Sequence, residues 1–220
     1  MESKRFTAPL QKNYELANQL AYRLVSERLA RLDDIEQQCV NSGARCKAAD
    51  SKQTVTISYL NQSYLIAFPD IEVSRADSAE KVPLRDKLLI LHYFISAKGT
   101  PLAGKQITFR ELPAGVVYFP TFSKRTVKPI LDHFGQEPKR LIDVAAELGG
   151  HRVDYGNAAV TIDAFSRVAI TIILWQGDAE FAAQGNVVFD ANISDYLPTE
   201  DITVLCESIA WRLVRLLKSN

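Results

Sequence analysis

A run of branched aliphatic residues from Val168 to Trp175 constrains the fold most strongly. This segment, predicted as a strand over 167–175, has almost no polar residue, so we expect the sheet to be covered on both of its faces here. Ala158–Phe165 is a second strong strand candidate. Four shorter strands are predicted at 54–60, 63–68, 107–109 and 187–189.

Helices are predicted where apolar residues recur at three- and four-residue spacing. They are expected over 13–32, 33–40, 84–96, 121–134, 138–148 and 199–218. Residues 84–96 are apolar around most of the helix circumference, which places that helix in the core. The polar segments 44–52 and 74–83 are expected to be loops, the second of them inside one domain.

These elements predict one α+β domain over residues 1–220. Its sheet is expected to be largely antiparallel, with about four to six strands and with helices packed on it. A chain of 220 residues is long enough to bury a sizeable core without disulfides or structural metals.

The charge balance and the cysteines exclude several classes of protein. Lys+Arg and Asp+Glu are equal at 26 each, so no net field attracts nucleic acid or an anionic membrane. The three cysteines, Cys39, Cys46 and Cys206, contain no CxxC pair, which argues against disulfides and a metal site. The polar residues 1–15 lack the apolar core of a signal peptide, and no apolar run is long enough to span a membrane. We therefore expect a soluble, cytoplasmic protein.

Two local patterns have ordinary structural explanations. Residues 99–105 match the opening of a phosphate-binding P-loop, but Gln106 follows where a hydroxyl would bind Mg²⁺. The predicted helix before it and strand after it also reverse the order that a P-loop needs, so a turn is expected. His92 lies in the apolar helix and is expected to be a hydrogen-bonded core residue.

The acidic residues are unevenly distributed along the chain. Residues 168–211 contain no Lys or Arg but seven carboxylates, whereas 98–152 is rich in basic residues. The carboxylates are expected to be mostly solvated, with Glu200 and Asp201 serving a helix N-terminus. They also fit a cation or acid–base site, or an interface with the basic stretch.

Within this acidic stretch, residues 175–181 hold the candidate site. If the segment stays extended, Asp178 and Glu180 point to one side, and two close carboxylates would raise one pKa. Equally, one of them could pair with Arg110 or Arg152 and brace the loop. The candidate ligand-binding residues are Trp175, Asp178, Glu180, Phe181, Arg110 and Tyr118. Asp178 and Glu180 are also the candidate catalytic residues; no metal ligand is predicted and the cofactor is unknown.

The order of several segments resembles the bacterial and archaeal domain-of-unknown-function family numbered 3786. The resemblance is carried by 88–93, 99–102, 109–113, Tyr118, 134–135, 149–150, 175–181, 196–198 and 200–201. It implies no catalytic residue. Some members resemble fusions to cysteine-rich iron–sulfur modules of corrinoid proteins, which implies an accessory role near one-carbon metabolism. This chain lacks the cysteine module.

Three functional classes follow from these observations. The preferred class is an accessory domain that binds a small molecule or cofactor near the candidate residues. The second is an acid–base or metal-assisted enzyme that uses Asp178 and Glu180. The third is a dimeric protein–protein interaction module, with a homodimer as the candidate assembly, in which acidic and basic segments meet. Neither nucleic acid nor a membrane is an expected partner.

Overall fold

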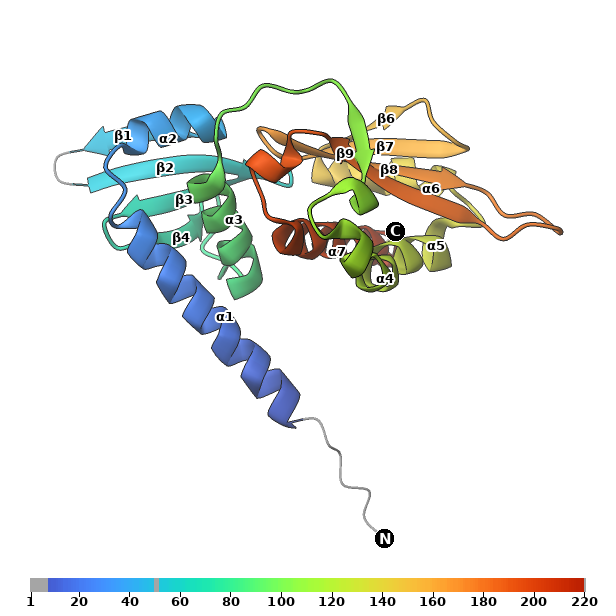
Figure 1. The fold of residues 1–220 in the computed structure, drawn as a ribbon, viewed down its shortest axis with the longest axis horizontal. Helices are drawn as coiled ribbons and strands as arrows, with labels where there is room; N and C mark the ends of the chain where they lie inside the picture. Colours follow the sequence, from blue (N-terminus) through green and yellow to red (C-terminus); the bar gives the residue numbers. More distant parts are fainter. Residues whose placement is uncertain (1–7, 50–51, 220) are drawn as a thin grey trace, which may run out of the picture.

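The computed structural model describes residues 8–49 and 52–219 and confirms an α+β fold with an antiparallel sheet (Figure 1). The absence of a signal peptide was predicted partly from residues 1–7, which lie outside the described residues, as do 50–51 and 220. Among the described helices, none is long and apolar enough to cross a membrane.

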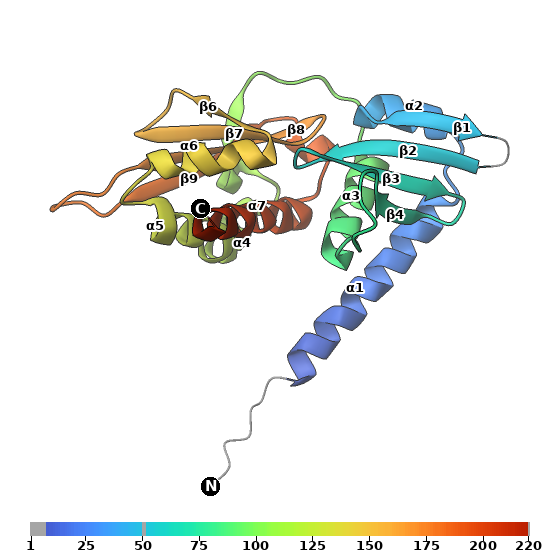
Figure 2. The same cartoon turned by 180° about the vertical axis from the view of Figure 1, so that it is seen from behind.

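The first half of the fold is a four-stranded antiparallel sheet with three helices. Its strands are β1 (Arg45–Ala49), β2 (Lys52–Tyr59), β3 (Gln62–Phe68) and β4 (Glu72–Arg75), paired in chain order. Its helices are α1 (Ala8–Leu29), α2 (Ile35–Ser42) and α3 (Leu84–Ser96). In Figures 1 and 2, α3 lies against this half of the sheet and α1 leans diagonally past it.

The second half has five antiparallel strands in the order β6-β7-β8-β9-β5. These are β5 (Gln106–Thr108), β6 (Gly150–Val153), β7 (Ala158–Phe165), β8 (Val168–Trp175) and β9 (Gln184–Asp190). Its helices are α4 (Gly115–Phe122), α5 (Lys128–Phe134), α6 (Lys139–Ala145) and α7 (Thr199–Ser219), with a π-helical turn over Ser123–Val127. Figures 1 and 2 show α7 running beneath the strands of this half.

One residue pair joins the two halves of the sheet. Tyr59 at the end of β2 is opposite Phe165 at the end of β7, and the N–H of Leu60 donates to the carbonyl of Ala164 at 3.0 Å. The rings reinforce this joint: Phe165 stacks on Tyr93 of α3 with centroids 4.0 Å apart, and on Tyr59 at 4.9 Å. We call Tyr59, Tyr93 and Phe165 the aromatic seam.

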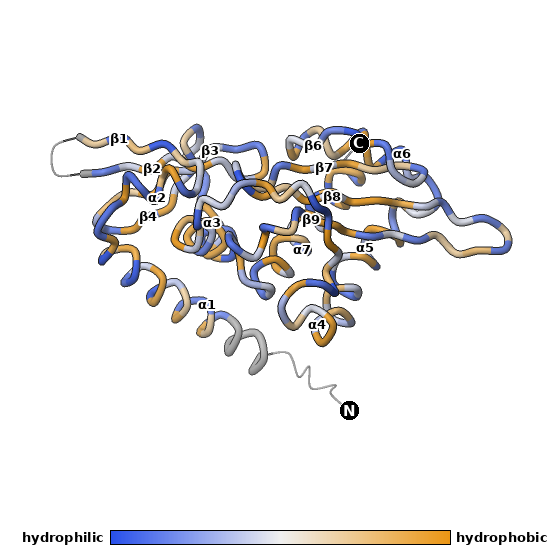
Figure 3. The backbone as a smooth tube through the Cα atoms, turned by 45° about the horizontal axis from the view of Figure 1, so that its top comes forward, coloured by the Kyte–Doolittle hydropathy of each residue, from blue (hydrophilic) through white to orange (hydrophobic). Residues whose placement is uncertain are grey.

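The core follows from the hydrophobic pattern. Figure 3 shows hydrophobic segments concentrated in α3, β7 and β8, where the sequence predicts burial. In α7 the buried positions recur at helical spacing: Ile202, Leu205, Ile209 and Leu213. The two acidic residues in its first turn and Lys218 in its last complement the helix dipole.

Four expectations need correction. Within residues 8–49 and 52–219 the sheet has nine strands, more than the four to six expected. Most of the loop predicted at 44–52 is β1, a polar edge strand whose pattern carries no hydrophobic signal. No strand was predicted directly after the helix at 138–148, but a short edge strand, β6, follows the glycine at which that helical segment ends. The helix predicted at 121–134 begins earlier, in α4, and contains the π-helical turn.

Candidate functional site

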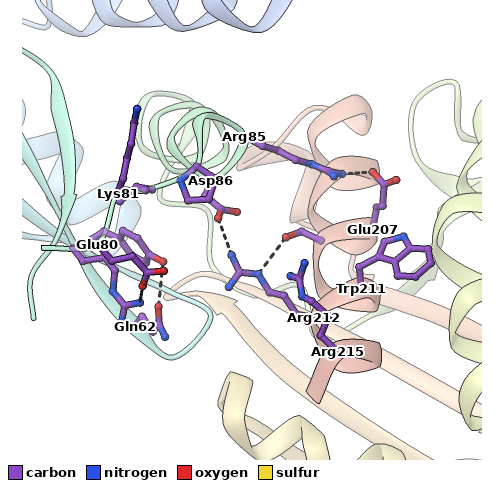
Figure 4. Close-up of a pocket in the computed structure, with 14 residues that line it drawn as sticks. Gln62, Glu80, Lys81, Arg85, Asp86, Glu207, Trp211, Arg212 and Arg215 are labelled. Atoms are coloured by element: carbon purple, nitrogen blue, oxygen red, sulfur yellow. Dashed lines mark hydrogen bonds and ion pairs between the residues drawn. The ribbon is translucent and has the colours of Figure 1, made fainter. Parts of the chain in front are cut away.

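A cleft of about 680 Å³ opens where the two halves meet, between α3 and α7 (Figure 4). One wall comes from the first half: the end of β4, the segment that leads into α3, and the first turn of α3. The other wall is the face of α7 that carries Glu207, Ser208, Trp211, Arg212 and Arg215. The site is thus assembled from segments far apart in the sequence.

An ion pair between a buried carboxylate and a partly buried guanidinium group forms the floor of this cleft. Nη2 of Arg212 donates to Oδ2 of Asp86 at 2.8 Å, and the Asp86 side chain is only 6% exposed. The hydroxyl of Tyr59 donates to the other carboxylate oxygen at 3.1 Å. Burial and the Asp86 charge both raise the pKa of Tyr59, so its hydroxyl stays protonated and remains a donor. Asp86 also lies in the first turn of α3, where the helix dipole favours a negative charge.

A second cluster closes one end of the cleft. The carboxylate of Glu207 accepts hydrogen bonds from Arg85 of α3 and from Arg125 of the π-helical turn. Burial raises the pKa of Glu207, but the two guanidinium groups outweigh it and hold the pKa below its ordinary value. Arg85 also donates to the carbonyl of Val204 at 3.1 Å, which ties α3 to α7.

The charges that line the cleft do not cancel. Three of its basic residues have carboxylate partners: Arg75 lies 3.3 Å from Glu80, and the other two belong to the clusters above. Lys81 and Arg215 line the cleft from opposite walls and form no ion pair with a described residue. The basic residues are Arg75, Lys81, Arg85, Arg212 and Arg215, against Glu80, Asp86 and Glu207, which leaves a net charge of +2.

An exposed tryptophan lies on the α7 wall of the cleft, one helical turn from Arg215. Trp211 is 43% exposed and lines the cleft. It lies four residues after Glu207 and four before Arg215, so the three share one face of α7. A large ring on the same helix face as Arg215, which has no carboxylate partner among the described residues, offers a contact surface as well as charge.

The residues predicted from sequence lie elsewhere. Residues 176–183 form the connection between β8 and β9, and the segment turns instead of staying extended. Oδ1 of Asp178 accepts the N–H groups of Glu180 at 2.8 Å and Phe181 at 2.7 Å. These bonds lower the pKa of Asp178, the opposite of the shift expected for two crowded carboxylates. Trp175, Asp178, Glu180 and Phe181 are all exposed on this hairpin.

Neither expected arginine braces this hairpin. The guanidinium group of Arg110 lies 3.8 Å from the ring centroid of Phe119, and Arg152 lies 3.7 Å from Asp154. Tyr118 lines a separate cavity, together with His92. The described contacts therefore do not gather the six predicted residues into one site. Among the described residues, no group of three or more His, Cys, Asp or Glu side chains is placed to hold a metal ion.

Sequence reasoning missed the cleft because its residues form no motif. In the sequence, Arg212 and Arg215 look like basic residues near the end of a helix, where the helix dipole favours a positive charge. One signal was available: Asp86 is an acidic residue in an apolar helix that was predicted to lie in the core, where a buried charge requires a partner.

Comparison with known proteins adds a family and nothing beyond it. A family model described as a domain of unknown function (DUF3786) matches residues 34–212. The matched range includes Asp86 and the α7 face of the cleft as far as Arg212, and it leaves α1 outside. No curated protein and no solved structure gives a significant match.

Proposed function

The chain belongs to the DUF3786 family, whose description assigns no function, and we propose from the geometry of the α3–α7 cleft that it binds a small anionic molecule there. The observation that carries this proposal is the pair of cations without a carboxylate partner among the described residues, Lys81 and Arg215, on opposite walls of the cleft.

The electrostatics favour an anion over a cation or a neutral ligand. The Asp86–Arg212 and Glu207 clusters satisfy the other charges near the floor, so an entering anion meets the two remaining cations. Charge-assisted hydrogen bonds from guanidinium and ammonium groups suit carboxylate and phosphate oxygens. The volume of about 680 Å³ is within the range of small-molecule sites.

Trp211 favours a ligand that also has a planar part. Its ring lies on the face of α7 that carries Arg215, so one molecule can place an acidic group at the arginine and a flat ring on the indole. A mononucleotide combines these two features and is a suitable first probe. The physiological setting that we propose, from the family resemblance, is an accessory role near iron–sulfur and corrinoid one-carbon metabolism.

The test uses the fluorescence of Trp211. Trp175→Phe removes the other tryptophan, and the remaining signal is titrated with inorganic phosphate, pyrophosphate and adenosine monophosphate. We expect saturable quenching by at least one probe. Arg215→Gln and Lys81→Gln should each weaken it by about tenfold, the loss expected for one charge-assisted hydrogen bond.

Lys218→Gln is the matched control, because it removes the same charge from the exposed last turn of α7, outside the cleft. The proposal would be contradicted if none of the probes binds, or if Lys218→Gln weakens binding as much as Arg215→Gln and Lys81→Gln do. Asp178→Ala and Glu180→Ala in the same assay test the hairpin predicted from sequence. If these two variants lose binding and Arg215→Gln does not, the site is the hairpin.

A further inference from the structure

A second cavity lies beside the cleft, and Arg85 lines both. It has a volume of about 420 Å³ and is enclosed by α1, α3, α4 and α7. Much of its wall is apolar: Ala21, Leu88, Leu89, Val204 and the ring of Tyr118. A cavity of this size with a few polar groups among apolar side chains is typical of a small-molecule site.

The polar feature of this cavity is a histidine oriented by a carboxylate. Nδ1 of His92 lies 2.8 Å from Oδ2 of Asp201, and their side chains are 28% and 17% exposed. A carboxylate only accepts hydrogen bonds, so the proton of this bond belongs to Nδ1. In the neutral ring Nε2 therefore keeps a free electron pair, and it has no hydrogen bond with any described residue.

The pair ties α3 to α7, and both of its residues also line the cavity. A structural tie needs only the Nδ1 bond, whereas here the imidazole also lines a cavity with an unused acceptor nitrogen. Asp201 fixes the tautomer and stabilises a positive charge on the ring, which is how carboxylates support histidines that accept protons. The other charged groups that line the cavity are Arg85, Arg125 and Glu200.

We propose that this cavity binds a small, largely apolar molecule with an acidic hydroxyl group, a phenol or an enol, whose hydroxyl donates to Nε2 of His92. The O–H proton passes to Nε2, which leaves an oxyanion on the ligand and an imidazolium paired with Asp201. The apolar walls contact the body of the molecule. This inference is independent of the anion proposed for the α3–α7 cleft.

The experiment uses 4-nitrophenol, whose phenolate is yellow and whose protonated form is nearly colourless. Slightly below the pH at which the free probe ionises, the protein should produce a saturable rise in phenolate absorbance. His92→Gln should abolish the rise, and Asp201→Asn should reduce it by about tenfold, since the tautomer and the charge partner are lost. His151→Gln, at an exposed histidine, is the matched control and should leave the rise unchanged.

Two further measurements keep the test decisive if His92→Gln unfolds. Thr121→Trp places a bulky ring at an exposed position of the cavity wall and leaves the His92–Asp201 pair intact, so it should remove the signal. The probe 4-nitrotoluene, in which a methyl group of similar size replaces the hydroxyl, cannot donate to Nε2 and should compete at least tenfold more weakly. An absent rise in the wild-type protein, or one that survives Thr121→Trp or His92→Gln, would overturn the proposal; Arg215→Gln should not affect it.

Discussion

The guanidinium group of Arg212 lies 2.8 Å from the carboxylate of Asp86, although 126 positions separate the two residues in the chain. Each comes from a different half of the fold, so their contact fixes α3 against α7 at the floor of the cleft. By fixing the two helices relative to one another, this contact also fixes the positions of Arg85 and Arg215 in the cleft.

Arg212→Met should destabilise the fold by about 3 kcal/mol, because Asp86 would remain buried without its cation. The measurement is urea unfolding followed by circular dichroism. Asp77→Asn is the comparison, since it removes an exposed pair with Arg75 and should cost less than about 1 kcal/mol. If both variants lost the same free energy of unfolding, the Asp86–Arg212 pair would stabilise the fold no more than an exposed ion pair does.

Glu207→Gln should flatten the acid dependence of stability. The folded-state pKa of Glu207 lies below its ordinary value of 4.5, so the stabilisation is complete above that pH and is lost as pH falls through the folded value. At pH 7 the variant should be about 1.5 kcal/mol less stable than the wild type. The gap should close as the pH falls through the folded-state pKa of Glu207. Glu147→Gln, at an exposed carboxylate, should show no such gap.

Phe165→Ala should cost about 4 kcal/mol, because the ring is buried and stacks on both tyrosines of the aromatic seam. The same change at Phe181, which is 66% exposed on the β8–β9 hairpin, should be nearly neutral. Thermal unfolding of the two variants makes the comparison. A small effect of Phe165→Ala would mean that the halves do not depend on the seam.

Gly115→Ala should destabilise the start of α4, which carries Tyr118. A Cβ atom there would lie 2.0 Å from the carbonyl oxygen of Phe109, so the backbone has to move, at a cost of about 2–3 kcal/mol. Gly104→Ala meets nothing within 4 Å, but its φ of +66° costs about 1 kcal/mol. A lower denaturant midpoint for Gly104→Ala than for Gly115→Ala would contradict this prediction.

Most elements of the fold could be predicted from the sequence because their hydrophobic period is strong. The predicted helix over 84–96 coincides with α3, and the alternation in 54–60 and 63–68 indicates β2 and β3. The edge strands β1 and β6 could not be predicted in this way. They are held by backbone pairing with β2 and β7, and their side chains give almost no hydrophobic pattern.

The candidate sites were less accessible to sequence reasoning. Asp178 and Glu180 drew attention because they are neighbours in the chain, yet Asp178 closes its own turn. Asp86 and Arg212 meet only through the packing of α3 on α7, which no local spacing reveals. His92 was expected to be a hydrogen-bonded core residue. It is hydrogen-bonded, but its side chain is 28% exposed, and both its partner Asp201 and the cavity beside it result from the same packing.

The one-residue junction between β2 and β7 has a consequence for how this fold can diversify. In a continuous sheet many backbone hydrogen bonds hold two neighbouring strands together. Here the described backbone pairing between β2 and β7 is limited to Tyr59 opposite Phe165 and the adjoining Leu60–Ala164 hydrogen bond. The spacing of the cleft walls therefore depends on the packing of Tyr59, Tyr93 and Phe165 as well as on the Asp86–Arg212 pair. Substitutions at these three positions, none of which needs to touch a ligand, are a route by which selection can retune the size of molecule that the cleft accepts.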